Sequence, residues 1–234
     1  MVVAASAGGR LANSGCARRV PPTAALIVLL RAIGDPERLA VGLRFAGEVY
    51  GRAGDVERAR ALYQESIEHS DPNGRVRISA LHNYGELELQ RANVERGTEL
   101  LEEALAAVRL RHPGTEHEPL ILHGLGDAAL ALRQAHLAAT RYREALKRAR
   151  QLKISNVLPM CMAGLAAAAS EQHDDRGASV LWGAAQTFDR DYGPMQPYER
   201  APYEQRLQHL DDELVEKGRQ LPEDEAIEYA LSEK

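Results

Sequence analysis

The chain has 234 residues, of which 44% are hydrophobic and 27% charged. This composition is too apolar for a disordered chain, and the length suffices for one core or a short array of repeats. Aromatic residues make up only 5%, which disfavours a β-sandwich or barrel. The net charge of −5 disfavours direct binding of nucleic acid, which requires a basic surface. The two cysteines form no spaced framework, so we expect a reducing, cytoplasmic compartment.

The N-terminal residues 1–22 are rich in Gly, Ala, Ser and Pro, and we expect them to form a disordered leader. The apolar run from Ala24 to Leu30 is far shorter than the roughly 20 residues of a membrane span. Arg31 follows it at once without a small-residue cleavage site, which argues against a signal peptide. We therefore predict a helix over 23–33, the second half of an incomplete repeat.

Four windows of the chain, which start at Leu43, Leu81, Leu122 and Met162, align without gaps at intervals of 38, 41 and 40 residues. A small residue recurs early in each window: Gly47, Gly85, Gly126 and Ala166. Twelve positions later a second small residue recurs: Ala59, Gly97, Ala138 and Ala178. Four positions after that comes a large residue: Tyr63, Leu101, Tyr142 and Trp182. Apolar residues at spacings of three and four on both sides of a central break predict two helices per window, and hence an all-α fold.

The predicted array covers residues 23–190 and contains four helix pairs. Their expected ranges are 36–52 with 55–69, 75–91 with 94–110, 118–132 with 135–152, and 156–171 with 175–190. Repeat units are therefore expected at 36–69, 75–110, 118–152 and 156–190. Asp35, Asp55, Asn93 and Asp174 are predicted helix N-caps, and Gln134 is a weaker one. Residues 191–234 are predicted to form C-terminal capping helices, one over 199–217 and one from Pro222.

The spacing of Gly47, Tyr50, Ala59 and Tyr63 resembles the tetratricopeptide repeat (TPR). The standard TPR period is 34 residues, so these units are longer between hairpins, and HEAT or armadillo repeats are the nearest competitor on length. The resemblance implies a right-handed superhelix of helical hairpins, with a concave surface lined by the first helix of each pair.

The tail, residues 176–231, resembles the end of the TPR-like region of large ATP-binding, LuxR-type and MalT-like bacterial transcriptional regulators. In that family the repeat region senses an inducer or a protein and restrains a nucleotide-binding switch. No GxxxxGK[ST] phosphate loop occurs here and no helix-turn-helix follows Leu231. The resemblance therefore implies a sensor or interaction module of a transcription regulator without the ATPase and DNA-binding domains.

Polar residues on the first helices are the candidates for partner binding, because the implied concave surface is built from these helices. They are Arg44, Glu48, Arg52, His82, Asn83, Glu86, His123 and Asp127. Glu48, Glu86 and Asp127 recur at one repeat position, which predicts an acidic line that favours a basic or amine-bearing segment. The alternative is an acidic face without a partner.

The pairs His82/Glu86 and His123/Asp127 could in principle hold zinc. Ordinary pairing of residues four apart on a helix is preferred, since no HExxH or paired-cysteine motif is present. No GxSxG motif occurs, and neither cysteine has a histidine neighbour in sequence. No catalytic, cofactor-binding or metal-binding residue is predicted. Tyr50, Tyr63, Tyr142 and Trp182 are expected to pack between helices rather than to form an aromatic binding cage.

The sequence thus predicts a non-enzymatic scaffold that binds a protein or peptide and makes no direct contact with nucleic acid or membrane. A homodimer is left open. The alternative from another class is a receptor that encloses a small-molecule inducer. A hydrolase or metalloenzyme built on helical repeats is a third hypothesis.

Overall fold

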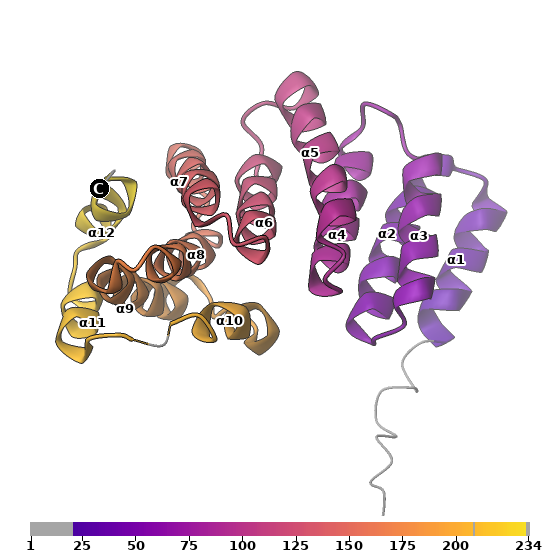
Figure 1. Ribbon diagram of the computed structural model, residues 1–234. Helices are drawn as coiled ribbons and strands as arrows, with labels where there is room; N and C mark the ends of the chain where they lie inside the picture. Colours follow the sequence, from indigo (N-terminus) through magenta and orange to yellow (C-terminus); the bar gives the residue numbers. More distant parts are fainter. Residues whose placement is uncertain (1–20, 208, 233–234) are drawn as a thin grey trace, which may run out of the picture. The chain divides into compact units, whose positions relative to one another are not determined.

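The computed structural model describes residues 21–207 and 209–232. Twelve α-helices and no strands are found in this part of the chain, so the predicted all-α class is confirmed. The chain divides into two compact units, residues 1–69 and 70–234, called unit 1 and unit 2 below. Figure 1 labels the helices.

Unit 1 contains α1 (Pro21–Ile33), α2 (Pro36–Arg52) and α3 (Val56–His69). Helix α2 begins after Asp35, whose side chain accepts hydrogen bonds from the backbone N–H groups of Glu37 and Arg38 at 3.1 Å. Helices α2 and α3 form a hairpin. They approach closely because Gly47 has no side chain: a Cβ at that position would lie 2.8 Å from the ring of Tyr63.

Unit 2 contains the remaining nine helices. Six form three consecutive hairpins: α4 (Arg75–Gln90) with α5 (Val94–Arg111), α6 (His117–Ala131) with α7 (Ala135–Leu152), and α8 (Leu158–Glu171) with α9 (Asp175–Tyr192). The first helices of successive hairpins also contact one another, α4 with α6 and α6 with α8. The last three are α10 (Pro197–Glu204), α11 (Asp212–Arg219) and α12 (Glu223–Leu231).

Small residues facing large ones set the distance between the helices of unit 2. The ring of Tyr142 lies between α6 and α8 and touches the backbone of both. A Cβ on Gly126 would be 2.4 Å from the ring, and a Cβ on Gly164 would be 2.5 Å from it. In the preceding hairpin, Leu101 takes the equivalent place beside Gly85. The residues singled out for repeat packing are all buried: Gly47, Tyr50, Ala59, Tyr63, Gly85, Gly97, Leu101, Gly126, Ala138, Tyr142, Ala166, Ala178 and Trp182.

The turn inside each of the four hairpins has a left-handed residue at the same repeat position. Gly54 has φ +86°, and it is followed in register by Ala92 (φ +60°), Arg133 (φ +57°) and His173 (φ +62°). Only the first of these is glycine, the residue that adopts this conformation without a steric cost. The other three turns therefore hold a side chain in a conformation that costs about 1 kcal/mol.

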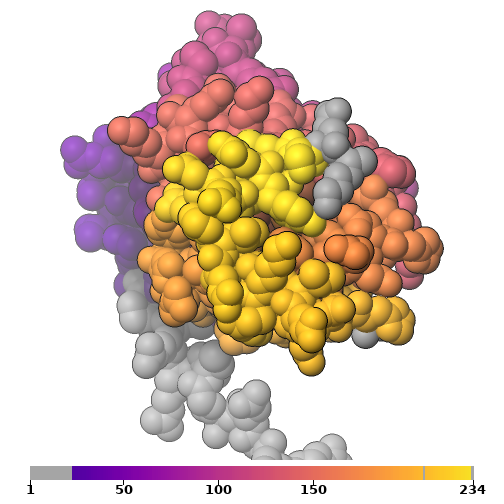
Figure 2. Space-filling model, turned by 90° about the vertical axis from the view of Figure 1, so that its left-hand side faces the viewer, coloured from indigo at the N-terminus to yellow at the C-terminus, as the bar shows by residue number. Residues whose placement is uncertain are grey.

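The C-terminal helices cover one end of unit 2, as the yellow segments in Figure 2 show. Helix α11 packs against α9 at Gly183 and Gly218. A Cβ on Gly183 would lie 2.0 Å from the carbonyl oxygen of Val215, and a Cβ on Gly218 would lie 2.1 Å from that of Val180. The two backbones are thus in direct contact. Helix α12 packs against α7 and α9.

The predicted helix over 199–217 is wrong. The chain forms α10, leaves the helical conformation after Glu204, and starts α11 where the side chain of Asp211 accepts from the N–H groups of Glu213 and Leu214 at 2.9 and 3.1 Å. A strong N-cap therefore starts a new helix inside the predicted one. Pro202 lies within α10 without ending it.

The predicted cap at Asn93 is also wrong, because its side-chain N–H donates to Oε2 of Glu88 at 2.9 Å and no helix N–H reaches its oxygen. Asp35, Asp55 and Asp174 do cap their helices. The expected leader lies outside the described residues, apart from Pro21 and Pro22, which begin α1. Within the described ranges, no helix combines the length and the apolar character needed to cross a membrane.

Candidate functional site

Polar side chains from the first helices of unit 2 make the candidate site. His82 and Glu86 lie on α4, and His123 and Asp127 lie on α6 at the same repeat positions. We call these four residues the polar face. Because α4 and α6 are in contact, the two pairs are neighbours. A Cβ on Gly124 of α6 would lie 3.6 Å from Oε1 of Glu86, which places the Glu86 carboxylate against α6.

Asp127 is the centre of a hydrogen-bonded cluster. The hydroxyl groups of Tyr142 on α7 and Tyr203 on α10 both donate to its Oδ1, each at 2.7 Å. The Nε2 atom of His123 lies 2.8 Å from the Tyr203 hydroxyl, and its Nδ1 atom lies 3.6 Å from Oδ2 of Asp127. Three helices, α6, α7 and α10, therefore contribute to one hydrogen-bonded cluster.

The direction of these hydrogen bonds follows from the carboxylate of Asp127, which only accepts. Burial, and next the negative charge of Asp127, raises the pKa of Tyr142 and of Tyr203 well above the ordinary value, so both phenols stay protonated and donate to the carboxylate. Since the proton of Tyr203 is directed to Asp127, its oxygen accepts from Nε2–H of His123. The arrangement is suited to holding a hydroxyl group between a carboxylate and an imidazole.

The pair on α4 is more open than the pair on α6. The Glu86 side chain is 40% exposed, and its Oε1 lies 3.3 Å from Nε2 of His82, although the geometry is not that of a hydrogen bond. Burial raises the pKa of Glu86, but the rings of His82 and His123 together outweigh this and lower the pKa below 4.5. Glu86 therefore carries a negative charge at neutral pH.

The other predicted partner-binding residues have different surroundings. In unit 1, Glu48 pairs with Arg52 at 2.7 Å, and Arg44 stacks over the ring of Phe45 at 3.9 Å. Asn83 is half-buried on α4. Of the predicted acidic line, Glu86 and Asp127 are the two members in unit 2, and only Glu86 is free of hydrogen bonds from tyrosine.

Around the polar face, the described residues form neither a reactive thiol nor a metal-binding cluster. Cys161 on α8 is fully buried, and this burial, with the charge of Asp127, raises the pKa of its thiol far above the ordinary range. The thiolate that would act as a nucleophile is therefore not formed near neutral pH. In the described ranges, no group of three or more His, Cys, Asp or Glu side chains is arranged to hold a metal ion.

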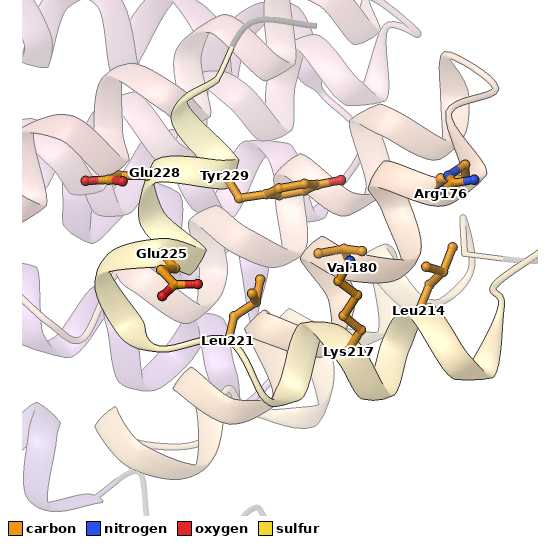
Figure 3. A pocket seen from close by; sticks show the side chains of 8 residues that line it. All are labelled: Arg176, Val180, Leu214, Lys217, Leu221, Glu225, Glu228 and Tyr229. Atoms are coloured by element: carbon orange, nitrogen blue, oxygen red, sulfur yellow. The ribbon is translucent and has the colours of Figure 1, made fainter.

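A pocket of about 480 Å³ lies elsewhere in unit 2, between α9, α11 and α12. Val180, Leu214 and Leu221 supply apolar lining, and the ring of Tyr229 extends across it (Figure 3). Charged side chains border it: Arg176 and Lys217 from α9 and α11, and Glu225 and Glu228 from α12. Its volume falls in the range of small-molecule sites.

Sequence reasoning missed Tyr203 and the pocket. Tyr203 is 80 positions from His123, and no periodicity connects α10 to the repeats. The pocket depends on how α11 and α12 fold back onto α9. A comparison with models of known protein families gives no match, and a comparison with curated proteins gives none either.

Proposed function

We propose that this chain is a non-enzymatic, TPR-type scaffold that binds a segment of another protein on the polar face of unit 2. The resemblance of its repeats to the TPR, and of its tail to LuxR-type and MalT-like regulators, makes a sensor or interaction module of a transcription regulator the preferred setting.

The observation that carries the proposal is the repetition of a histidine–carboxylate pair on adjacent first helices, one pair already holding a side chain from another helix. Asp127 accepts a hydrogen bond from the Tyr203 hydroxyl, and His123 donates one to the same hydroxyl. Glu86, at the equivalent position, is ionised and partly exposed. Such a surface favours a partner that brings hydroxyl and cationic groups.

The experiment is a charge reversal at Glu86. Asp127 is not suitable for this substitution, because its loss also removes the hydrogen bond of the buried Tyr142. Glu86→Lys should weaken binding to the basic members of an array of peptides graded in net charge. Glu99→Lys is the matched control, since Glu99 lies on the second helix of the same hairpin and is 66% exposed. Equal peptide binding by wild type and Glu86→Lys contradicts the proposal.

The pocket favours a second candidate, a receptor for a small molecule. Its cationic and acidic borders with an apolar floor suit a ligand that carries both charges on a small apolar frame. Native mass spectrometry of the purified chain tests this: a bound small molecule that is lost in Val180→Trp supports a receptor, and a ligand-free mass with no thermal shift in a metabolite panel contradicts it.

A further inference from the structure

Helix α10 lies on the first helices of unit 2 although it belongs to no hairpin. It packs against α8 (Figure 1) and places Tyr203 on α6. Tyr203 is the one buried residue of α10, at 4% exposure. Besides this inserted ring, the helix is held by Arg200, which pairs with the mostly buried Asp189 at 3.3 Å and lies over the Trp182 ring at 5.2 Å. It has no apolar stripe of its own.

Arg206, three residues after Tyr203, makes a second set of contacts with the scaffold. The Arg206 guanidinium pairs with Oε1 of Glu171 at 3.1 Å, where the Glu171 side chain is 15% exposed. The hydroxyl of Ser170 donates to the carbonyl oxygen of Arg206 at 2.9 Å. Acidic side chains of the scaffold therefore receive a phenol and a guanidinium from one short segment.

The first helix of the last hairpin differs from the other two at the repeat positions of the polar face. The positions that hold His123 and Asp127 on α6 hold Ala163 and Ala167 on α8. Both alanines are fully buried, and Gly164 lies between them. At these two repeat positions α8 therefore has no long polar side chain. The first helices are thus polar on α4 and α6 and small on α8.

We propose that α10 is an internal ligand of the partner-binding surface, and that an external partner binds as α10 does, with a tyrosine on His123 and Asp127 and an arginine three positions later on Glu171. This inference rests on the proposed function and specifies its partner. The external segment replaces α10. Because the tethered helix competes at a high effective concentration, an intact chain binds a free segment weakly.

The test supplies α10 in trans. A fluorescein-labelled peptide of residues 196–207 is titrated by anisotropy onto two full-length chains, the wild type and Tyr203→Ala/Arg206→Ala. In the substituted chain the internal segment loses its contacts with Asp127, His123 and Glu171 and keeps those of Arg200 with α9. The doubly substituted chain should bind the peptide at least about tenfold more tightly than the wild type, because the tethered competitor is weakened. Circular dichroism confirms that the chain remains helical.

Peptide variants serve as controls that leave the protein unchanged. A peptide with Tyr203→Phe should bind about fivefold more weakly, since it lacks the hydroxyl held by Asp127 and His123. A peptide with Arg206→Ala should also bind more weakly, and a scrambled peptide should not bind. Equal affinity for all of these peptides, or no peptide binding by a folded, substituted chain, overturns the inference.

Amide hydrogen exchange on the wild-type chain keeps the test decisive if the double substitution unfolds the protein. A displaceable α10 should exchange through local opening, much faster than α6 and α8. Exchange of α10 only with global unfolding would show that it is a fixed part of the core. Binding of basic array peptides that is unaffected by release of α10 would retain the proposed function and reject this inference. If the α10 peptide binds and no peptide of the array does, the partner-binding surface is retained and its preference for basic segments is rejected.

Discussion

Gly183 and Gly218 bring α9 and α11 together so closely that a Cβ on either residue would overlap a backbone carbonyl of the other helix, at 2.0 and 2.1 Å. A side chain can rotate away from such an overlap, but a carbonyl oxygen moves only with its helix. The position of α11, and with it one wall of the pocket, therefore depends on two residues that lack side chains.

Gly218→Ala should destabilise the protein by about 2–3 kcal/mol, because α11 must move away from α9. Urea unfolding measures the change. Lys217→Ala, on the exposed face of the same helix, should lie within about 0.5 kcal/mol of the wild type. Equal midpoints for the wild type and Gly218→Ala would mean that α11 does not pack here.

Ala92→Gly should instead stabilise the protein, by about 0.5–1 kcal/mol, because glycine adopts the left-handed conformation of this turn without strain. The opposite result is expected for Ala106→Gly, at an exposed position inside α5, which should cost about 1 kcal/mol. In thermal unfolding, the midpoint should rise for Ala92→Gly and fall for Ala106→Gly. A loss of stability in both would indicate that Ala92 is not left-handed in solution.

Glu118→Gln should destabilise unit 2 by about 2 kcal/mol. The Glu118 side chain is 4% exposed and accepts from Arg148 at 2.5 Å and from Arg109 at 3.3 Å, so neutralising it leaves two guanidinium groups without their buried charge partner. The loss is moderated because both arginines are partly exposed.

The matched control for this change is Glu116→Gln, two residues earlier, where the side chain is 54% exposed and pairs with Arg75 at the surface. It should change the free energy of unfolding by less than about 1 kcal/mol. If Glu116→Gln lowered the free energy of unfolding as much as Glu118→Gln, burial of Glu118 would not explain its larger contribution to stability.

The contribution of Glu86 to stability should depend on pH. Its pKa is lower in the folded chain than the ordinary 4.5, so the stabilisation is fully present above pH 4.5 and is lost as the pH falls through the folded-state value. The difference in unfolding free energy between wild type and Glu86→Gln should therefore be larger just above pH 4.5 than in more acidic solution. A difference that grows below pH 4.5 would reverse the assigned sign.

The helical hairpins could be predicted because their signals are local. Apolar spacing and small residues locate α2 to α9 to within about two residues at each end, and Asp35 and Asp174 cap their helices as expected. The break after Glu204 is absent from the prediction, because the apolar spacing continues through it.

The candidate site was only partly predictable. The spacing of His123 and Asp127 indicates that they share a helix face, and the structure places them there. That Tyr203 would lie on this pair depends on where the chain returns after α9, which no local pattern determines. The pocket depends on the close approach of α9 and α11 at Gly183 and Gly218, and glycine in a helix gives no indication of the element it faces.

Oδ1 of Asp127 accepts hydrogen bonds from both Tyr142 and Tyr203. One of these phenols is wedged in the core between Gly126 and Gly164, while the other belongs to α10. A single oxygen atom thus joins the interior of the hairpins to the segment on their surface, and substitutions at the two tyrosines should be non-additive. A change at the Tyr203 hydroxyl should therefore also alter the strength of the hydrogen bond from Tyr142, which lies in the core of unit 2.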